Sequence, residues 1–287
     1  MAITTLAGAN TGLTYAKKFV KLAPATVGVS IWYSTWFASG APISGVADLT
    51  TSGGVAQSST SAQVTGQITF TDPASGNSYL AGARAAVGNA NAVVNAPQMM
   101  LCDRLWECGL NDTSTAAFSP TIVTPTAQTI TTMATLPARD LNGATNGDGV
   151  YIALEVQSLM GGGASVFTLS YTNSVGTAGR TASTVQTYVS ATTKGGFYPF
   201  ALQAGDVGVR SVQSITASVS QTSGQWILVA FRPLLIVDPA NNSPMTTVVD
   251  PLTGGFQRMY NGSVPFWLYR GNLGTPGLFG AVNVSQG

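Results

Sequence analysis

The chain contains no histidine among its 287 residues. Histidine is the commonest metal ligand, and it is the side chain whose ordinary pKa lies nearest neutral pH. A Ser–His–Asp triad, a Cys–His pair and a histidine-based zinc site are therefore excluded within this chain. Catalysis by paired carboxylates remains open. No two of the 11 acidic residues lie close enough in sequence to suggest such a pair on one strand face.

Charge is scarce as well, at 8% of the residues, whereas an ordinary soluble domain has about 25%. Because a free monomer usually relies on a charged surface for solubility, this surface either depends on Ser, Thr, Asn and Gln or is covered by neighbours. Both conditions suit an assembled, extracellular or particle-bound protein. The net charge of +1 predicts only weak attraction to nucleic acid. The one basic run, Lys17, Lys18 and Lys21, is either a solvated segment or a contact with an acidic neighbour.

Long hydrophobic runs are also missing. The most apolar stretch, WILVAFRPLLIV at 226–237, is short for a membrane-spanning helix and is interrupted by Arg232 and Pro233. The N-terminus lacks the basic and apolar regions of a secretory signal peptide. We therefore expect no membrane partner.

Cysteine occurs only twice, and both residues lie in the stretch QMMLCDRLWECGLND at 98–112. Pro97 and Gly109 stand where a helix would begin and end, and the residues between them are good helix formers. The pattern predicts one short helix. On a helix Cys102 and Cys108 would be separated by about 9 Å along the axis and about 120° around it, too far for a disulfide. We interpret them as buried structural thiols; a disulfide across a turn, or redox or metal chemistry, remains an alternative.

The predicted helix would be amphipathic. Leu101, Leu105 and Cys108 would face the body of the protein. The more polar residues of the stretch, Asp103, Arg104 and Glu107, would form its solvent side or a subunit contact.

Elsewhere the sequence pattern predicts β-strands. In GVYIALEVQSL, apolar residues from Val150 to Val156 alternate with other side chains, which is typical of a half-buried strand. Short strands separated by Gly-rich turns predict a mainly β protein with a β-sandwich or jelly-roll-like body, one short helix and extended N- and C-terminal arms. We divide it into an N-terminal arm at 1–63, a β body at 64–237 and an irregular aromatic extension at 238–287.

Large aromatic rings are concentrated in the two terminal segments. We expect these rings to anchor contacts between subunits, as aromatic hot spots do in protein interfaces. The residues concerned are Trp32, Trp36, Phe266, Trp267 and Tyr269.

One loop has a sequence pattern similar to that of a calcium-binding loop. In RDLNGATNGDG at 139–149, the residues Asp140, Asn142, Asn146 and Asp148 space oxygen ligands as a calcium loop does. Thr145 replaces the turn glycine, however, and no Glu follows at the twelfth position. A turn whose Asx side chains cap its own backbone accounts for the same residues, so we predict no metal and no cofactor.

Four segments resemble a group of uncharacterised structural proteins of tailed bacteriophages: LCDRLWECG, TLPARDLNGATNGDGVYIALEV, LSYTNSVGTAGRTA and FALQAGDVGVRSVQSITAS. The resemblance covers about 98–232. It implies a β-structured virion component on or near the capsid, with no catalytic residues to carry over. The expected partners are the major capsid protein or other virion proteins and further copies of the chain, a trimer being favoured.

The leading hypothesis is a non-enzymatic virion protein that binds and stabilises the capsid exterior as a decoration or minor capsid protein. The alternative is a receptor- or glycan-binding tail fibre, spike or neck component, which would need an exposed aromatic platform. The tyrosines considered for it are Tyr151, Tyr171, Tyr188 and Tyr198. A glycan- or peptide-cleaving enzyme is the third hypothesis, with Asp140, Asp148 and Glu155 as its best carboxylates.

Overall fold

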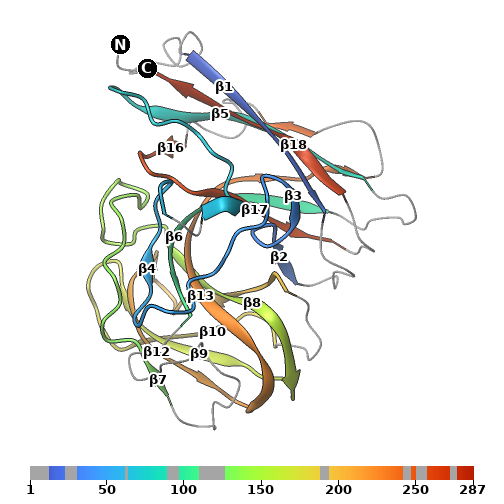
Figure 1. The fold of residues 1–287 in the computed structure, drawn as a ribbon. Helices are drawn as coiled ribbons and strands as arrows, with labels where there is room; N and C mark the ends of the chain where they lie inside the picture. Colours follow the sequence, from blue (N-terminus) through green and yellow to red (C-terminus); the bar gives the residue numbers. More distant parts are fainter. Residues whose placement is uncertain are drawn as a thin grey trace. The chain divides into compact units, whose positions relative to one another are not determined.

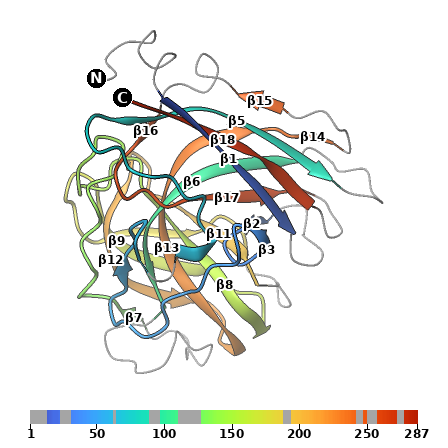
Figure 2. The ribbon, with the colours of Figure 1, turned by 45° about the horizontal axis from the view of Figure 1, so that its top comes forward.

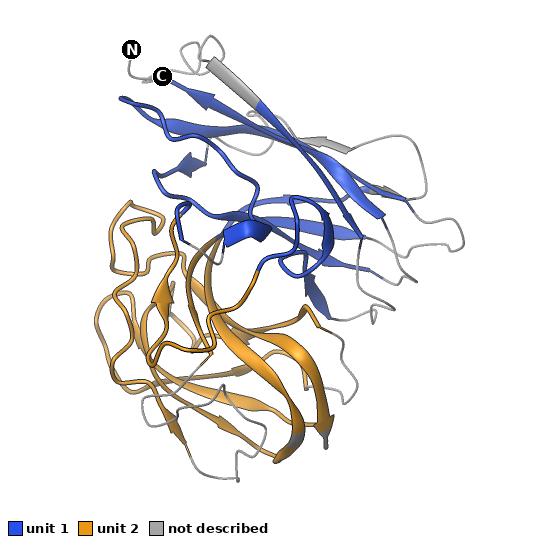
Figure 3. Ribbon diagram, viewed as in Figure 1, with its two compact units in different colours: residues 1–45, 59–103, 233–287 blue, residues 46–58, 104–232 orange. Residues whose placement is uncertain are grey.

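A computed structural model describes residues 13–22, 31–61, 64–88, 97–109, 127–187, 194–241, 247–249, 257–271 and 277–287. The chain forms two compact units (Figure 3). Unit 1 comprises 1–45, 59–103 and 233–287, and unit 2 comprises 46–58 and 104–232. Strands β6 (Gln98–Cys108) and β13 (Gln221–Val237) run from one unit into the other. Almost every regular element is a strand, so the prediction of a mainly β, jelly-roll-like protein is confirmed.

Unit 1 contains a seven-stranded sheet with the order β14-β5-β18-β1-β3, in which β15 and β16 also pair with β5. The long strands β1 and β18 are antiparallel from Leu13↔Gln286 to Leu22↔Gly277, so the two ends of the described chain lie side by side (Figures 1 and 2). The bounds are β1 Leu13–Leu22, β3 Ser39–Ala41, β5 Ser78–Gly88, β14 Ala240–Asn241, β15 Thr247–Val249, β16 Arg258–Met259 and β18 Gly277–Gln286.

A second layer of unit 1 faces this sheet. It contains β2 (Trp32–Ser34), β17 (Pro265–Arg270) and the first half of β6. Alternate side chains of both layers meet in one apolar core, including Phe19, Leu80 and Val282 from the first layer and Leu101 and Trp267 from the second. The terminal segments thus contribute strands β1, β2, β17 and β18 to this sandwich, where extended arms were expected, because apolar side chains of these strands complete the core.

Unit 2 is built from a curved run of antiparallel strands, ordered β13-β8-β11-β10-β9-β12-β7, with β4 pairing with β6. Strand β9 alternates strictly between buried and half-buried side chains, as a strand with one covered face should. The bounds are β4 Val55–Ala56, β7 Gln128–Thr129, β8 Tyr151–Gly162, β9 Phe167–Asn173, β10 Arg180–Thr184, β11 Gly196–Ala201 and β12 Val209–Ala217.

Strand β8 corrects one expectation. Ile152, Leu154 and Val156 are fully buried as expected, but so are Ala153 and Glu155 of the opposite face. The strand is therefore covered on both sides along this stretch rather than half-buried.

The predicted helix at 98–109 is wrong: the segment is strand β6. It hydrogen-bonds with β17 from Gln98 to Asp103 and with β4 at Trp106 and Glu107. Pairing with strands distant in sequence outweighs a local helix propensity of a few tenths of a kcal/mol per residue. The only helical element among the described residues is a 3₁₀ turn, Val64–Gly66. No helix in the described part of the chain has the length and apolarity needed to cross a membrane.

Candidate functional site

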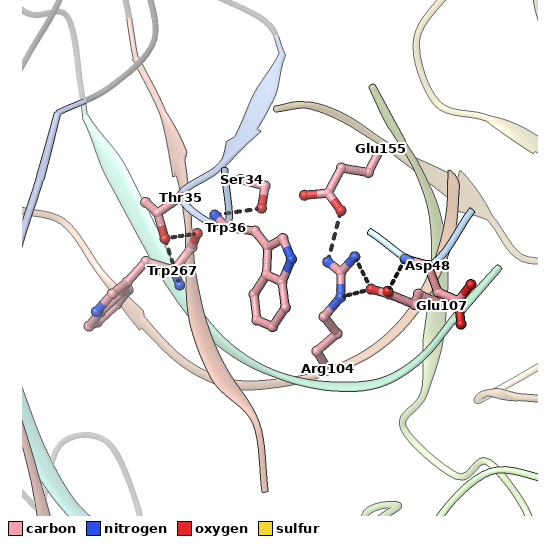
Figure 4. A network of polar contacts seen from close by, with 8 residues as sticks. All are labelled: Ser34, Thr35, Trp36, Asp48, Arg104, Glu107, Glu155 and Trp267. Carbon is pink, nitrogen blue, oxygen red and sulfur yellow. Dashed lines mark hydrogen bonds and ion pairs between the residues drawn. The ribbon is translucent and has the colours of Figure 1, made fainter. Parts of the chain in front are cut away.

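A cluster of buried charges lies in unit 2, where β6 and β8 contribute the side chains (Figure 4). The guanidinium of Arg104 donates to Glu107 at 2.8 Å through Nε and to Glu155 at 2.8 Å through Nη1. Its Nη2 lies 2.6 Å from the Glu107 carboxylate. All three side chains are fully buried. Asp103, Arg104 and Glu107 were expected on the solvent side of a helix or in a subunit contact; all three are fully buried, so this expectation is corrected.

The cluster also fastens the segment 46–58 to β6. The second carboxylate oxygen of Glu107 accepts the backbone N–H of Asp48 at 2.7 Å. Gly54, at a φ of +77°, lies so close to β6 that a Cβ atom would be 2.4 Å from the Glu107 carbonyl oxygen. Only glycine permits this approach. Arg139, from the loop that precedes β8, also bonds to β6 by donating to the Arg104 carbonyl oxygen at 3.0 Å.

The electrostatics of the cluster are unbalanced, because two carboxylates share one guanidinium. Burial raises the pKa of Glu107 and outweighs the attraction of Arg104. Burial also opposes the charge on Arg104, but Glu155 and Glu107 together raise the pKa of that guanidinium above its ordinary value. Burying Arg104, Glu107 and Glu155 thus carries a large desolvation free energy, which is offset only while all three groups are present.

Chemically, this cluster can position the backbone, and its three side chains have no exposed surface. Glu155, one of the carboxylates considered for hydrolysis, is fully buried against Arg104. Asp140, another of them, is also buried, and its oxygens accept the backbone N–H groups of Asn142, Ala144, Gly147 and Asp148. The loop is therefore capped by its own Asx side chain.

The accessible candidate surface is a group of three loops in unit 2, which we call the loop platform: residues 139–149, 173–179 and 203–208. Backbone hydrogen bonds join the loops, from Gly149 to Val207 at 3.0 Å and from Ser174 to Gly208 at 3.0 Å. Arg210 adds bonds to Asn146 and to the Ser174 carbonyl oxygen. Three loops tied in this way present a fixed surface.

Asp206 fixes the third loop of the platform. Its carboxylate accepts hydrogen bonds from Arg180 at 2.9 and 3.0 Å, from Asn173 at 2.7 Å and from the Tyr171 hydroxyl. These bonds, that of Arg180 first, lower the pKa of Asp206 to about 2. The carboxylate therefore stays ionised and the loop stays fixed at any ordinary pH.

Aliphatic side chains stand out from the loop platform into solvent. Leu141 is 54% exposed, Val207 59% and Val175 78%. One comes from each loop, so the fixed scaffold carries three separate apolar contacts. The sequence drew attention to the polar residues of the first loop, as cation ligands, turn caps or catalytic carboxylates, and these aliphatic side chains were missed, although exposed aliphatic residues at loop tips could have suggested a contact surface.

The aromatic residues predicted to contact other subunits lie mainly within unit 1. Trp36, Phe266, Trp267 and Tyr269 are buried, and the ring of Trp36 lies edge-on to that of Phe266 at 6.0 Å between centroids. Trp32 is half-buried, with Arg270 over its ring at 5.8 Å.

Hydrogen bonds fix the turn that carries Trp36. Thr35 donates through its backbone N and its Oγ1 to the Trp267 carbonyl oxygen (Figure 4). Four of the five predicted contact rings are therefore buried, two of them, Trp267 and Tyr269, in the apolar core of unit 1.

The other predicted groups are also placed by the structure. Cys102 and Cys108 are both buried thiols. Tyr171 and Tyr198 are buried, so the aromatic platform considered for glycan binding does not form as expected; Tyr151 is 37% exposed. Tyr188 lies outside the described residues.

A substantial share of the charged side chains is buried. Among 12 basic and 11 acidic residues, at least nine are buried: Lys21, Asp48, Asp103, Arg104, Glu107, Arg139, Asp140, Glu155 and Arg232. The surface is therefore even less charged than the composition indicates.

No family model and no curated protein matches the chain. Among solved structures, it is similar to the VP2 subviral particle of infectious bursal disease virus, with 11% identity, 96% of this chain and 81% of that chain covered, and a TM-score of 0.23. The T13 particle of the same virus aligns with 9% identity over 96% of this chain and 78% of that chain, at a TM-score of 0.21. Likenesses at such TM-scores carry no argument, so function is inferred from the residues of the chain itself.

Proposed function

We propose that the chain is a non-enzymatic structural protein of a tailed-bacteriophage virion, which binds the capsid exterior as a homo-oligomer and stabilises it. The observation that carries this proposal is the placement of charge. The chain has few charged residues, and at least nine of the 23 are buried, so fewer remain at the surface to keep a free monomer apart from its neighbours. Such a surface suits burial in an assembly.

Exposed aliphatic side chains on fixed structure support the same function. The loop platform offers Leu141, Val175 and Val207 on loops joined by hydrogen bonds, so little conformational entropy remains to be lost on docking. Interfaces of this kind gain affinity from buried apolar area and fit rather than from charge.

The first test is the oligomeric state of the full chain, measured by light scattering after gel filtration. A trimer or another closed oligomer is expected. The second test is co-sedimentation with capsids of the phage that encodes the chain, prepared without it; binding together with a higher capsid melting temperature is expected. A monomer that neither binds nor stabilises capsids would refute the proposal.

The alternative function is receptor or glycan binding by a tail fibre, spike or neck component. The loop platform favours this alternative, because a rigid set of loops at one end of a β-structure is a common form of recognition surface. Copy number separates the two functions, because a shell component is present in hundreds of copies per virion and a neck or tail component in about a dozen. Quantitative mass spectrometry of purified virions measures it directly.

A further inference from the structure

The near-neutral net charge conceals a segregation of charge in unit 1. The strands of the seven-stranded sheet carry five of the 12 basic residues and none of the 11 acidic ones. The five are Lys17, Lys18, Lys21, Arg84 and Arg258. The other seven basic residues share the rest of the chain with all the acidic ones.

Two of these cations lie on the outer face of the sheet, which we define as the face opposite the core. Phe19 of β1, Ala83 and Ala85 of β5 and Val282 of β18 face the core, so their neighbours along each strand point outward. Lys18 and Arg84 are such neighbours, and both are exposed.

The strand register places the two cations on either side of one small residue. Lys18 pairs with Ala281, and Ala281 pairs with Arg84. The cations therefore lie two strands apart, roughly 10 Å at the usual strand spacing. Because no acidic residue lies on these strands, the positive potentials of Lys18 and Arg84 add on this face.

An exposed apolar strip lies beside the cations on the same face. Val20 and Leu22 of β1 are 52% and 56% exposed, and Phe279 of β18, which pairs with Val20, is 37% exposed. The Phe279 ring extends over β5, where a Cβ atom at Gly88 would be 3.1 Å from it. On its described strands, the outer face thus combines an apolar strip with two cations and no anion.

We propose that this outer face docks an acidic protein surface on a neighbouring virion protein, one that carries carboxylates beside an apolar patch. Charge complementarity selects this occupant. A second copy docked through the same face would oppose cations to cations, which costs affinity. Sites for single-stranded nucleic acid usually offer more cations than this pair and several stacking rings, whereas the described strands of this face expose Phe279 alone among the phenylalanines. The identity of the partner as a virion protein rests on the function proposed above, whereas the charge preference of the face does not.

The charge preference is tested on the full chain by elution from a carboxymethyl resin at pH 7. Lys18→Gln, Arg84→Gln and Lys194→Gln lower the net charge equally, and Lys194 is an exposed residue of unit 2. If the outer face is what binds carboxylates, the Lys18 and Arg84 variants elute at lower salt than the Lys194 variant. Equal elution of all three overturns the proposal, whatever happens with capsids.

Docking is tested by co-sedimentation with capsids prepared without the chain. The double variant Lys18→Gln/Arg84→Gln is expected to bind at least roughly tenfold more weakly than wild type, as is common when charges are removed from a complementary interface, and Lys194→Gln to bind normally. Val20→Thr is expected to weaken binding, whereas Val185→Thr, a matched change at an exposed position of unit 2, is not.

The outcomes separate the two proposals. Capsid binding that is unaffected by the double variant overturns the docking face and leaves the proposed function standing. No capsid binding by wild type, with the expected order of elution, refutes the proposed function and supports an acidic partner elsewhere. An oligothymidine probe that binds wild type tightly, and the double variant weakly, would replace the protein partner with nucleic acid.

Discussion

Replacement of Arg104 by methionine is the sharpest test of how unit 2 is held together. Methionine keeps much of the aliphatic stem, so packing is largely preserved, but Glu107 and Glu155 lose the guanidinium that bonds them both at 2.8 Å. Removing one partner from a buried ion pair leaves an uncompensated buried charge and costs about 3–5 kcal/mol. At about 2–4 °C per kcal/mol for a domain of this size, the melting temperature should fall by roughly 6–20 °C.

The assay is thermal unfolding followed by calorimetry or tryptophan fluorescence. Arg180→Met is the matched control, because Arg180 also makes two bonds to one carboxylate but does so at the surface, where ion pairs contribute little. Its melting temperature should shift far less than that of Arg104→Met.

A rescue experiment distinguishes lost charge compensation from lost packing. The triple variant Arg104→Met/Glu107→Gln/Glu155→Gln has no buried charge in the cluster and should be clearly more stable than Arg104→Met alone. Lowering the pH should also stabilise the single variant, because its carboxylates can then be protonated. The reasoning is wrong if Arg104→Met unfolds like wild type, or if the triple variant is no more stable than the single one.

Three further predictions concern single positions. Burial lowers the pKa of Lys21 from 10.5 to about 8, so the unfolding free energy should rise as the pH is raised from about 8 to 10.5 and level off outside this range. Lys21→Met should lack this slope in pH-dependent thermal unfolding. Asp206→Asn should increase backbone hydrogen exchange at 203–208. In wild type the ionised carboxylate stabilises the loop above its ordinary pKa of 3.8, and this stabilisation is lost as the pH falls through about 2. The variant should show no such pH dependence. Gly147→Ala places a Cβ atom 1.9 Å from the Val209 carbonyl oxygen and should lower the unfolding free energy by clearly more than about 1 kcal/mol. Gly179→Ala, also at positive φ but with nothing within 4 Å of the new Cβ atom, should lower it less. Equal losses of unfolding free energy in denaturant titrations would contradict the steric argument.

Much of the candidate surface could not be read from local sequence. The outer face of unit 1 depends on a register that joins Lys18, Ala281 and Arg84, residues far apart in the chain. The sequence did indicate that the basic run contacts either solvent or an acidic neighbour. It could not show that Arg84 lies beside that run, because strand pairing over such separations has no local signature.

The stretch 98–108 illustrates the same division. Its composition predicts a helix, and its burial was partly expected from two cysteines among apolar residues. Helix and strand differ locally by little free energy, so the pairing of β6 with β17 and β4 decided the outcome. The buried role of Arg104 followed from that, because a strand covered by neighbours has no solvent side.

The sequence by itself determined the mainly β class, the absence of histidine chemistry, the low charge and the Asx-capped loop at Asp140, because composition and short-range hydrogen bonding suffice for each. Only the tertiary structure decided where the charges and rings lie. It buried four predicted contact rings, two of them in the core of unit 1, and gathered cations onto one sheet. The physical reason is that burial and electrostatic neighbourhood are sums over residues distant in the chain, which only the folded register brings together.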